Sequence, residues 1–125
     1  EKTTFQSSEE LTEILDYGTW TYPNGNIHIR GMVQVFRTTA PDPRGTGDNT
    51  VTVNANWTSD YTGPMYGTFS FETDEGGLWE GTWAGQMTAC GSNYKASGDG
   101  FRKYAGMKVW VDVICGVSTL TVLEH

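Results

Sequence analysis

The stretch from residue 66 to residue 113 constrains the fold more than any other part of the chain. It reads YGTFSFETDEGGLWEGTWAGQMTACGSNYKASGDGFRKYAGMKVWVDV, with a glycine every few residues and aromatic residues between them. Most of it alternates between apolar and polar residues, which is the period of a β-strand with one buried face. Turn-forming residues such as Asp74-Glu75-Gly76-Gly77 separate the alternating runs. The stretch therefore predicts consecutive antiparallel strands joined by tight corners.

Further alternating segments lie on both sides of this stretch. Residues 17–22 end at the hairpin turn Pro23-Asn24-Gly25-Asn26, and a long strand is predicted from Ile27 to Arg37. The other predicted strands span residues 50–58, 65–73, 78–87, 107–115 and 117–123, whereas residues 38–49 form a polar loop and residues 91–100 a looser stretch. Seven or eight short strands indicate a sandwich or a closed barrel. The glycine corners favour an all-β fold, a closed antiparallel barrel of about eight strands.

The 125 residues are enough for one domain with its own core. We expect residues 17–123 to form a single β-barrel domain, preceded by an N-terminal arm at residues 1–16. The sequence SSEE at residues 7–10 fits a capping box, and apolar residues follow at helical spacing, so a short helix and an irregular arm both stay open. Residues 124–125 resemble the remnant of an expression tag, and the opening Glu1 fits a chain from which a leader was removed.

The charge of the chain argues against nucleic acid as a partner. The net charge is −7, and the eight basic residues form no cluster that could follow a phosphate backbone. No apolar run approaches the length of a membrane span. His28 is the only histidine outside the last two residues, and nothing lies at metal-ligand spacing. We therefore expect no metal and no other cofactor.

The two cysteines, Cys90 and Cys115, bracket a predicted hairpin. This spacing suggests a disulfide, and a disulfide suggests an oxidising compartment, so the protein is expected to be secreted or periplasmic. The alternative is a pair of buried free thiols.

Large rings and branched aliphatic side chains gather on one face of the predicted strands. The residues on this face are Trp20, Tyr22, Ile27, Ile29, Val33, Val35, Val51, Val53, Trp57, Met65, Phe69, Phe71, Trp79, Trp83, Val109, Val111 and Val113. No carboxylate, histidine or lysine falls among them. The face is typical of a filled core. The sharper hypothesis is a cavity for a small apolar molecule, with these candidate ligand-binding residues: Trp20, Trp57, Phe69, Trp79 and Trp83.

The opposite face of the strands carries a second apolar group. Met32, Phe36, Trp110 and Ile114 point outward if the aliphatic faces point inward, and such exposed side chains suggest a homo-oligomer interface. Apolar residues scattered singly on the surface are the alternative reading.

The sequence assigns no catalytic residue. The acids lie mainly in predicted turns, and a single histidine without a fixed neighbour is no triad. Positioning alone can lower a reaction barrier, so whether the protein is an enzyme stays open.

Three segments resemble a known family. They are Asn24-Gly25-Asn26-Ile27-His28-Ile29-Arg30-Gly31; Gly67-Thr68-Phe69 with Gly76-Gly77-Leu78-Trp79-Glu80-Gly81-Thr82-Trp83; and Ser97-Gly98-Asp99-Gly100 with Tyr104-Ala105-Gly106-Met107-Lys108. Together they are similar to small bacterial barrels related to allene oxide cyclase. The resemblance implies a barrel around an apolar cavity and, in some relatives, cyclisation of a reactive polyene. A second resemblance is weaker: Gly18-Thr19-Trp20 is similar to the Gly-x-Trp of the first strand in lipocalin-like and avidin-like barrels.

Three functions follow as hypotheses. The first is a secreted or periplasmic barrel that binds a small apolar molecule in its interior. The second is a cyclase-type enzyme that uses the same cavity. The third is a carbohydrate-binding module, which requires coplanar exposed rings on one flat face. A polar group inside the barrel, opposite the tryptophans, would favour the enzyme.

Overall fold

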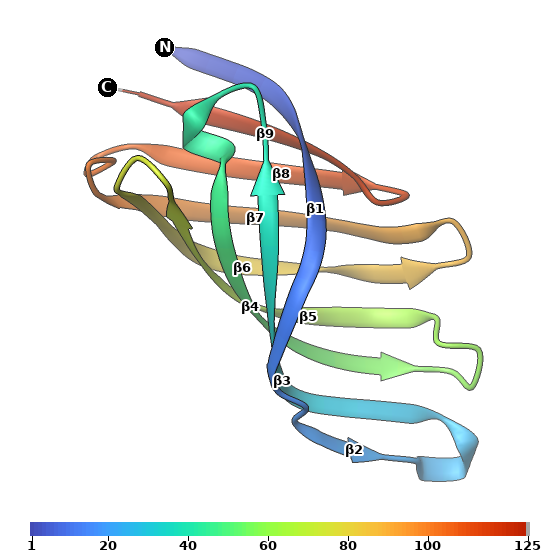
Figure 1. Cartoon of the computed structure of the whole chain (residues 1–125). Coiled ribbons are helices and arrows are strands. Elements are labelled where there is room, and N and C mark those ends of the chain that lie inside the picture. Colours follow the sequence, from blue (N-terminus) through green and yellow to red (C-terminus); the bar gives the residue numbers. More distant parts are fainter. Residues whose placement is uncertain (125) are drawn as a thin grey trace.

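The computed structural model describes residues 1–124, and in these residues the chain forms nine antiparallel strands in one sheet (Figure 1). The strands are β1 (Lys2–Asp16), β2 (Thr19–Thr21), β3 (Ile27–Thr39), β4 (Gly47–Trp57), β5 (Gly63–Thr73), β6 (Gly77–Thr88), β7 (Gly91–Arg102), β8 (Lys108–Ile114) and β9 (Val117–Leu123). Two short 3-10 turns, η1 (Pro23–Gly25) and η2 (Pro43–Gly45), lie in connections. The prediction of an all-β antiparallel fold is confirmed.

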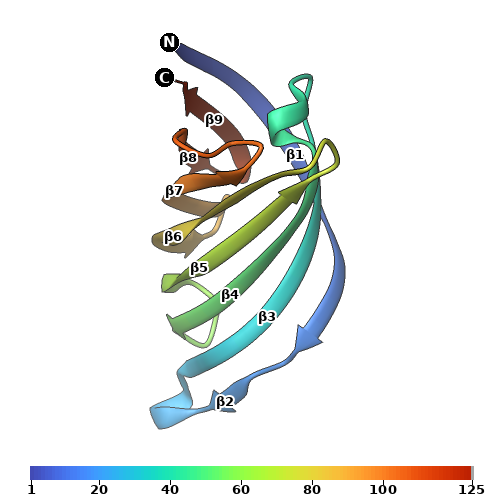
Figure 2. The same cartoon turned by 90° about the vertical axis from the view of Figure 1, so that its left-hand side faces the viewer.

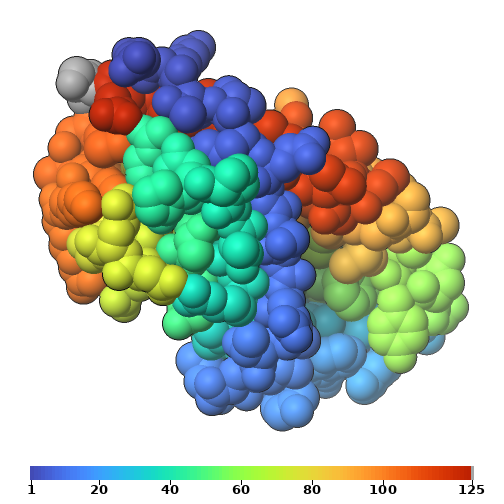
Figure 3. All heavy atoms as spheres, turned by 45° about the horizontal axis from the view of Figure 1, so that its top comes forward, coloured from blue at the N-terminus to red at the C-terminus, as the bar shows by residue number. Residues whose placement is uncertain are grey.

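Strand β1 closes the sheet into a hydrogen-bonded ring. Neighbouring strands pair in the order β9-β8-β7-β6-β5-β4-β3-β2, and β1 pairs with both β9 and β3. Its first part, Lys2–Ser7, lies against β9, and its second part, Ser8–Asp16, lies against β3. Figure 2 shows β1 spanning from the β9 side of the curved sheet to the β2 side. In Figure 3 it lies between the green residues before β4 and the red residues of β9.

The helix considered for residues 1–16 is wrong. These residues form β1, which is hydrogen-bonded along its length to one neighbour or the other. A capping-box pattern is a local signal of modest strength. Pairing with β9 and β3 overrides it because these two strands supply hydrogen-bond partners for the backbone N–H and C=O groups of β1. The looser stretch expected at residues 91–100 is likewise a regular strand, β7, paired with β6 through its whole length.

A β-bulge in β3 reverses the face that the strand turns inward. Ile29 pairs with Ala55, but the next pair is Met32 with Val53, so two residues of β3 lie opposite one residue of β4. Gly31 in the bulge has φ +74°, a conformation that favours glycine. Its backbone N–H donates to Asn54 Oδ1 at 3.0 Å.

The bulge changes which β3 side chains reach the interior. Before the bulge, the odd-numbered Ile27 and Ile29 are buried. After it, the even-numbered Met32 is buried, with 7% of its surface exposed. The predicted inward position of Val33 and Val35 is therefore wrong, since strand alternation now places both on the outer face.

One end of the ring is filled by a stacked aromatic pair. The Trp79 and Tyr104 rings lie 4.6 Å apart, and both residues are almost fully buried. The Tyr104 hydroxyl donates to Glu75 Oε2 at 2.5 Å and lies 2.8 Å from the Thr73 hydroxyl. Trp79 Nε1 donates to the Arg44 carbonyl at 2.9 Å. Both polar tips are thus satisfied, as buried Trp and Tyr require, and this end is closed.

The predicted disulfide is confirmed. The Sγ atoms of Cys90 and Cys115 lie 2.09 Å apart and link the β6–β7 turn to the β8–β9 turn. Within residues 1–124 no helix has the length and apolar character needed to cross a bilayer. Of the two residues regarded as a tag remnant, Glu124 forms an ion pair with Arg44, and His125 lies outside the described residues.

Candidate functional site: an interior cavity

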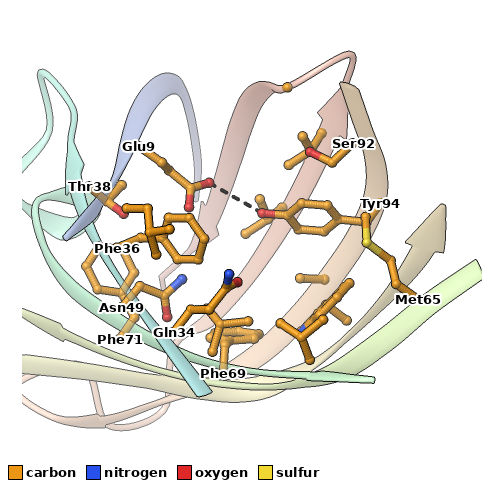
Figure 4. Close-up of a pocket in the computed structure, with 18 of the residues that line it drawn as sticks. Glu9, Gln34, Phe36, Thr38, Asn49, Met65, Phe69, Phe71, Ser92 and Tyr94 are labelled. Carbon is orange, nitrogen blue, oxygen red and sulfur yellow. Dashed lines mark hydrogen bonds between the residues drawn. The ribbon is translucent and has the colours of Figure 1, made fainter. Parts of the chain in front are cut away.

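The ring of strands encloses a cavity of about 360 Å³ (Figure 4). This volume lies within the range of small-molecule sites in proteins. Most of the wall is apolar, and its aromatic and sulfur-containing members are Phe36, Trp57, Phe69, Phe71, Trp79, Trp83, Tyr94, Met32, Met65 and Met87. Smaller aliphatic residues of β4, β7, β8 and β9 complete the wall, among them Val53, Ala96, Val111 and Leu120.

The cavity reaches the surface beside β1. Its lining includes Leu11, which is 46% exposed, and Gly116 of the β8–β9 turn, which is also exposed. Strand β1 leaves β9 after Ser7 and pairs with β3 from Ser8 onward. The later part of β1 therefore diverges from the β8–β9 turn, and we place the mouth of the cavity between them.

Four of the five predicted ligand-binding residues line this cavity: Trp57, Phe69, Trp79 and Trp83. The fifth, Trp20, does not line it. The Trp20 ring is half-buried on β2, and its Nε1 donates to the Tyr17 carbonyl at 2.7 Å.

Two further placements from the sequence need correction. Tyr22, predicted to face inward, is 64% exposed. Met32 and Phe36, predicted to point outward into a subunit interface, line the cavity because the bulge in β3 shifts the alternation. Trp110 does lie on the outer face, where it is 42% exposed.

The cavity also contains an acid that sequence reasoning missed. Glu9 of β1 lies in its wall, and its Oε1 accepts hydrogen bonds from the Tyr94 hydroxyl at 3.3 Å and from Ser118 Oγ at 3.1 Å. Figure 4 shows the Glu9 carboxylate reaching across the cavity toward Tyr94. The expectation that no carboxylate shares the apolar face is therefore wrong.

The surroundings of Glu9 change its acid–base chemistry. Removal from bulk water raises its pKa above the ordinary value, although the hydrogen bonds from Ser118 and Tyr94 act in the opposite direction. Burial raises the pKa of Tyr94 as well, and the nearby Glu9 charge adds to that effect. Glu9 is nevertheless an exposed residue, so its carboxylate lies at the open mouth of the cavity in contact with solvent. Glu9 and Tyr94 are thus a hydrogen-bonded pair of titratable groups in the wall of the cavity.

Three more polar side chains join Glu9 along one side of the cavity. Ser7, Glu9, Thr38 and Asn49 all line it, and we call these four residues the polar patch. Glu9 and Thr38 are directly opposite in the pairing of β1 with β3. Asn49 is two positions along β4 from Gly47, the β4 partner of Thr38. Figure 4 shows Glu9, Thr38 and Asn49 on the same side of the cavity.

The polar patch has unused hydrogen-bonding capacity. Ser7 Oγ, Thr38 Oγ1 and Asn49 Oδ1 are buried and make no hydrogen bond with any residue that the structure describes. Thr38 is only 3% exposed. Trp57 Nε1, toward the other end of β4, is in the same situation. Buried polar groups without a partner are rare in folded proteins, so each is a point where a bound molecule could be recognised.

Sequence patterns carried little information about the polar patch. Residues 5–11 read FQSSEEL, which alternates too weakly to reveal a strand with Ser7 and Glu9 on its inner face. Thr38 and Asn49 lie at the ends of the segment expected to be a polar loop. The one usable signal was Gly31, since an isolated glycine within a strand pattern often marks a bulge.

Within the described residues, no group of three or more His, Cys, Asp or Glu side chains is arranged to hold a metal ion. In comparisons with protein-family models, with curated proteins and with solved structures, the chain matches none.

Proposed function

We propose that this protein binds a small, mostly apolar molecule inside its ring of strands. The observation that supports the proposal is the open cavity of about 360 Å³ with an aromatic and aliphatic wall. An engineered cavity of about 150 Å³ accepts benzene, so the present one has room for roughly 12 to 18 non-hydrogen atoms. Apolar contact supplies the affinity, because burying apolar area contributes about 25 cal/mol per Å².

The resemblance of the sequence to allene oxide cyclase-like barrels, in which a barrel surrounds an apolar cavity, stays part of this proposal. We include in the proposal that the ring is a closed barrel of that kind. The disulfide supports a secreted or periplasmic location, because such bonds persist in oxidising compartments.

Tryptophan fluorescence offers a direct test, because Trp57, Trp79 and Trp83 line the cavity. A panel of fatty acids, terpenoids, polyenes and apolar amines is titrated into the protein. We expect at least one class to change the emission saturably, and no response across the whole panel would refute the proposal.

A matched pair of variants locates the binding. Ala96→Leu on β7 projects into the cavity and is expected to weaken binding by at least about 10-fold, since three added carbons take space from the ligand. Ala84→Leu on β6 adds the same atoms on the exposed outer face and should leave binding unchanged. Equal effects of the two variants would place the ligand elsewhere.

A cyclase-type enzyme is the second candidate, and the Glu9–Tyr94 pair specifically favours it. A titratable acid inside an apolar cavity can hold or release a proton at a reactive substrate, and the walls can fix the substrate's conformation. The test is to incubate the protein with a reactive polyene epoxide and measure the chirality of the cyclised product. An excess of one enantiomer supports catalysis, whereas a racemic product at the background rate removes this candidate.

The carbohydrate-binding hypothesis has less support. It needs coplanar exposed rings, and among the five tryptophans Trp110 is the exposed one.

A further inference from the structure

The polar patch can select the polar group of a bound molecule, which the apolar wall of the cavity cannot do. Ser7, Glu9, Thr38 and Asn49 come from three neighbouring strands and lie together on one side. Phe69 lies below them in Figure 4, and Trp83 is another apolar residue of the cavity lining. A molecule that fills this space would place one polar end at the patch and the rest of its surface against the rings.

The patch holds hydrogen-bond acceptors without partners, beside the donor groups of the Ser7 and Thr38 hydroxyls and the Asn49 amide. Glu9 Oε1 accepts two hydrogen bonds, but Glu9 Oε2 accepts none from the residues that the structure describes. A carboxylate has about four acceptor sites, so capacity remains. The buried oxygens of Thr38 and Asn49 add two more groups without partners. Leaving such groups unpaired is unfavourable, and this cost is recovered when a ligand supplies the partner.

The charge of the cavity lining indicates which charge a ligand should carry. Glu9 and Tyr94 are the titratable side chains among the described residues that line the cavity, and no lysine, arginine or histidine of residues 1–124 lies in that lining. An ionised Glu9 therefore gives the cavity a negative charge without a cation beside it. Because Glu9 is exposed at the mouth, solvent partly screens this charge, but it still favours a cationic partner over an anionic one at that end of the cavity.

We propose that the cavity selects apolar molecules that end in a primary ammonium group. The ammonium has three N–H donors and no acceptor, and Glu9 Oε2, Thr38 Oγ1 and Asn49 Oδ1 are acceptors of the patch that have no partner among the described residues. The hydrocarbon part lies against Phe69 and Trp83. This inference rests on the proposed function, and it names the substrate or ligand class of the same cavity.

Three probes with one hydrocarbon chain and different head groups test the inference: octylamine, octanol and octanoate. Binding is measured by tryptophan fluorescence and calorimetry at neutral pH, below the critical micelle concentrations. We expect octylamine to bind at least about 10-fold more tightly than octanol, because a hydrogen bond between an ammonium and a carboxylate is stronger than one from a neutral hydroxyl. Octanoate is expected to bind more weakly than either.

Two variants identify the residue responsible. Glu9→Gln keeps the shape of the side chain and should reduce the affinity for octylamine to that for octanol, while octanol changes by less than about 3-fold. Glu10→Gln removes the neighbouring acid, which is exposed like Glu9 but lies outside the cavity lining, and should preserve the preference for the amine. If Glu9→Gln fails to fold, the relative affinities of the wild-type protein for the three probes still test whether the cavity prefers the amine.

The outcomes separate this inference from the proposed function. Equal binding of the three probes, tighter binding of octanoate, or an amine preference that survives Glu9→Gln would each overturn the amine inference and leave an apolar binding protein. Failure of octylamine to bind overturns the inference whatever the wider panel gives. The proposed function falls only when the whole panel of apolar molecules also fails.

Discussion

Filling the cavity should stabilise the protein, and the sign of the effect tests whether the interior is hollow. Ala96 on β7 is 8% exposed, pairs with Trp83 and Val111 on the two neighbouring strands, and lines the cavity. Ala96→Leu adds three carbons that would occupy vacant space against apolar walls. At about 0.8 kcal/mol per buried carbon the gain is roughly 2.4 kcal/mol, and the lost side-chain entropy of leucine reduces it to roughly 1.5–2 kcal/mol.

This gain converts to a measurable change in melting temperature. An unfolding entropy of about 2.1 cal/mol/K per residue gives roughly 260 cal/mol/K for 125 residues. The expected rise in Tm is therefore about 6–8 °C, measured by circular dichroism and checked by urea unfolding. Ala84→Leu on the exposed face should stay within about 0.5 kcal/mol of wild type. If the interior were packed, Ala96→Leu would instead destabilise the protein by about 1–3 kcal/mol, and that result would refute the hollow ring.

Three further predictions concern other parts of the fold. The double variant Cys90→Ser/Cys115→Ser should lower the free energy of unfolding by about 3.5 kcal/mol, or the Tm by roughly 13 °C. The reason is that the disulfide restricts a loop of the unfolded chain that spans a separation of 25 residues. An unchanged Tm of the wild-type protein under reducing conditions would contradict this prediction. The pKa of Glu9 is raised by burial, so its stabilising contribution is complete below the unfolded-state pKa and is lost as the pH rises through the folded-state pKa. Glu9→Gln should therefore match wild type in acid and exceed its Tm at neutral pH, and a constant difference across pH would disprove the assignment. Gly67→Ala would place Cβ 1.7 Å from the Thr52 carbonyl oxygen, so a loss of roughly 2–3 kcal/mol in urea unfolding is expected, and an unaltered midpoint argues against that strand contact.

The inner faces of the middle strands could be predicted from the sequence. In β4, β5, β6 and β8 the apolar residues recur at every second position, and Val53, Phe69, Trp83 and Val111 all reach the cavity wall as alternation requires. The disulfide could also be predicted, because two cysteines on either side of a hairpin have few other partners. In these strands the burial of one face is strong enough to set the register locally.

The inner face of β3 beyond Ile29 could not be predicted in the same way. Strand β3 follows the expected alternation through Ile29, and a single extra residue at Gly31 then exchanges its faces. A strand pattern has a period of two, so one inserted residue turns every later side chain to the opposite side. This is why Met32 and Phe36 moved from a supposed outer surface into the wall of the cavity.

The sequence by itself determined that this chain is an antiparallel β-protein with aromatic inner faces, because period and turn chemistry are local properties. It suggested a disulfide between Cys90 and Cys115 and left free thiols as the alternative. Only the tertiary structure decided that residues 2–16 form the strand that joins β9 to β3, and that Glu9 lies opposite Tyr94. A polar segment such as FQSSEEL has no strong preference of its own. Its conformation is set by the hydrogen-bonding edges of strands more than 20 residues away, which no local pattern records.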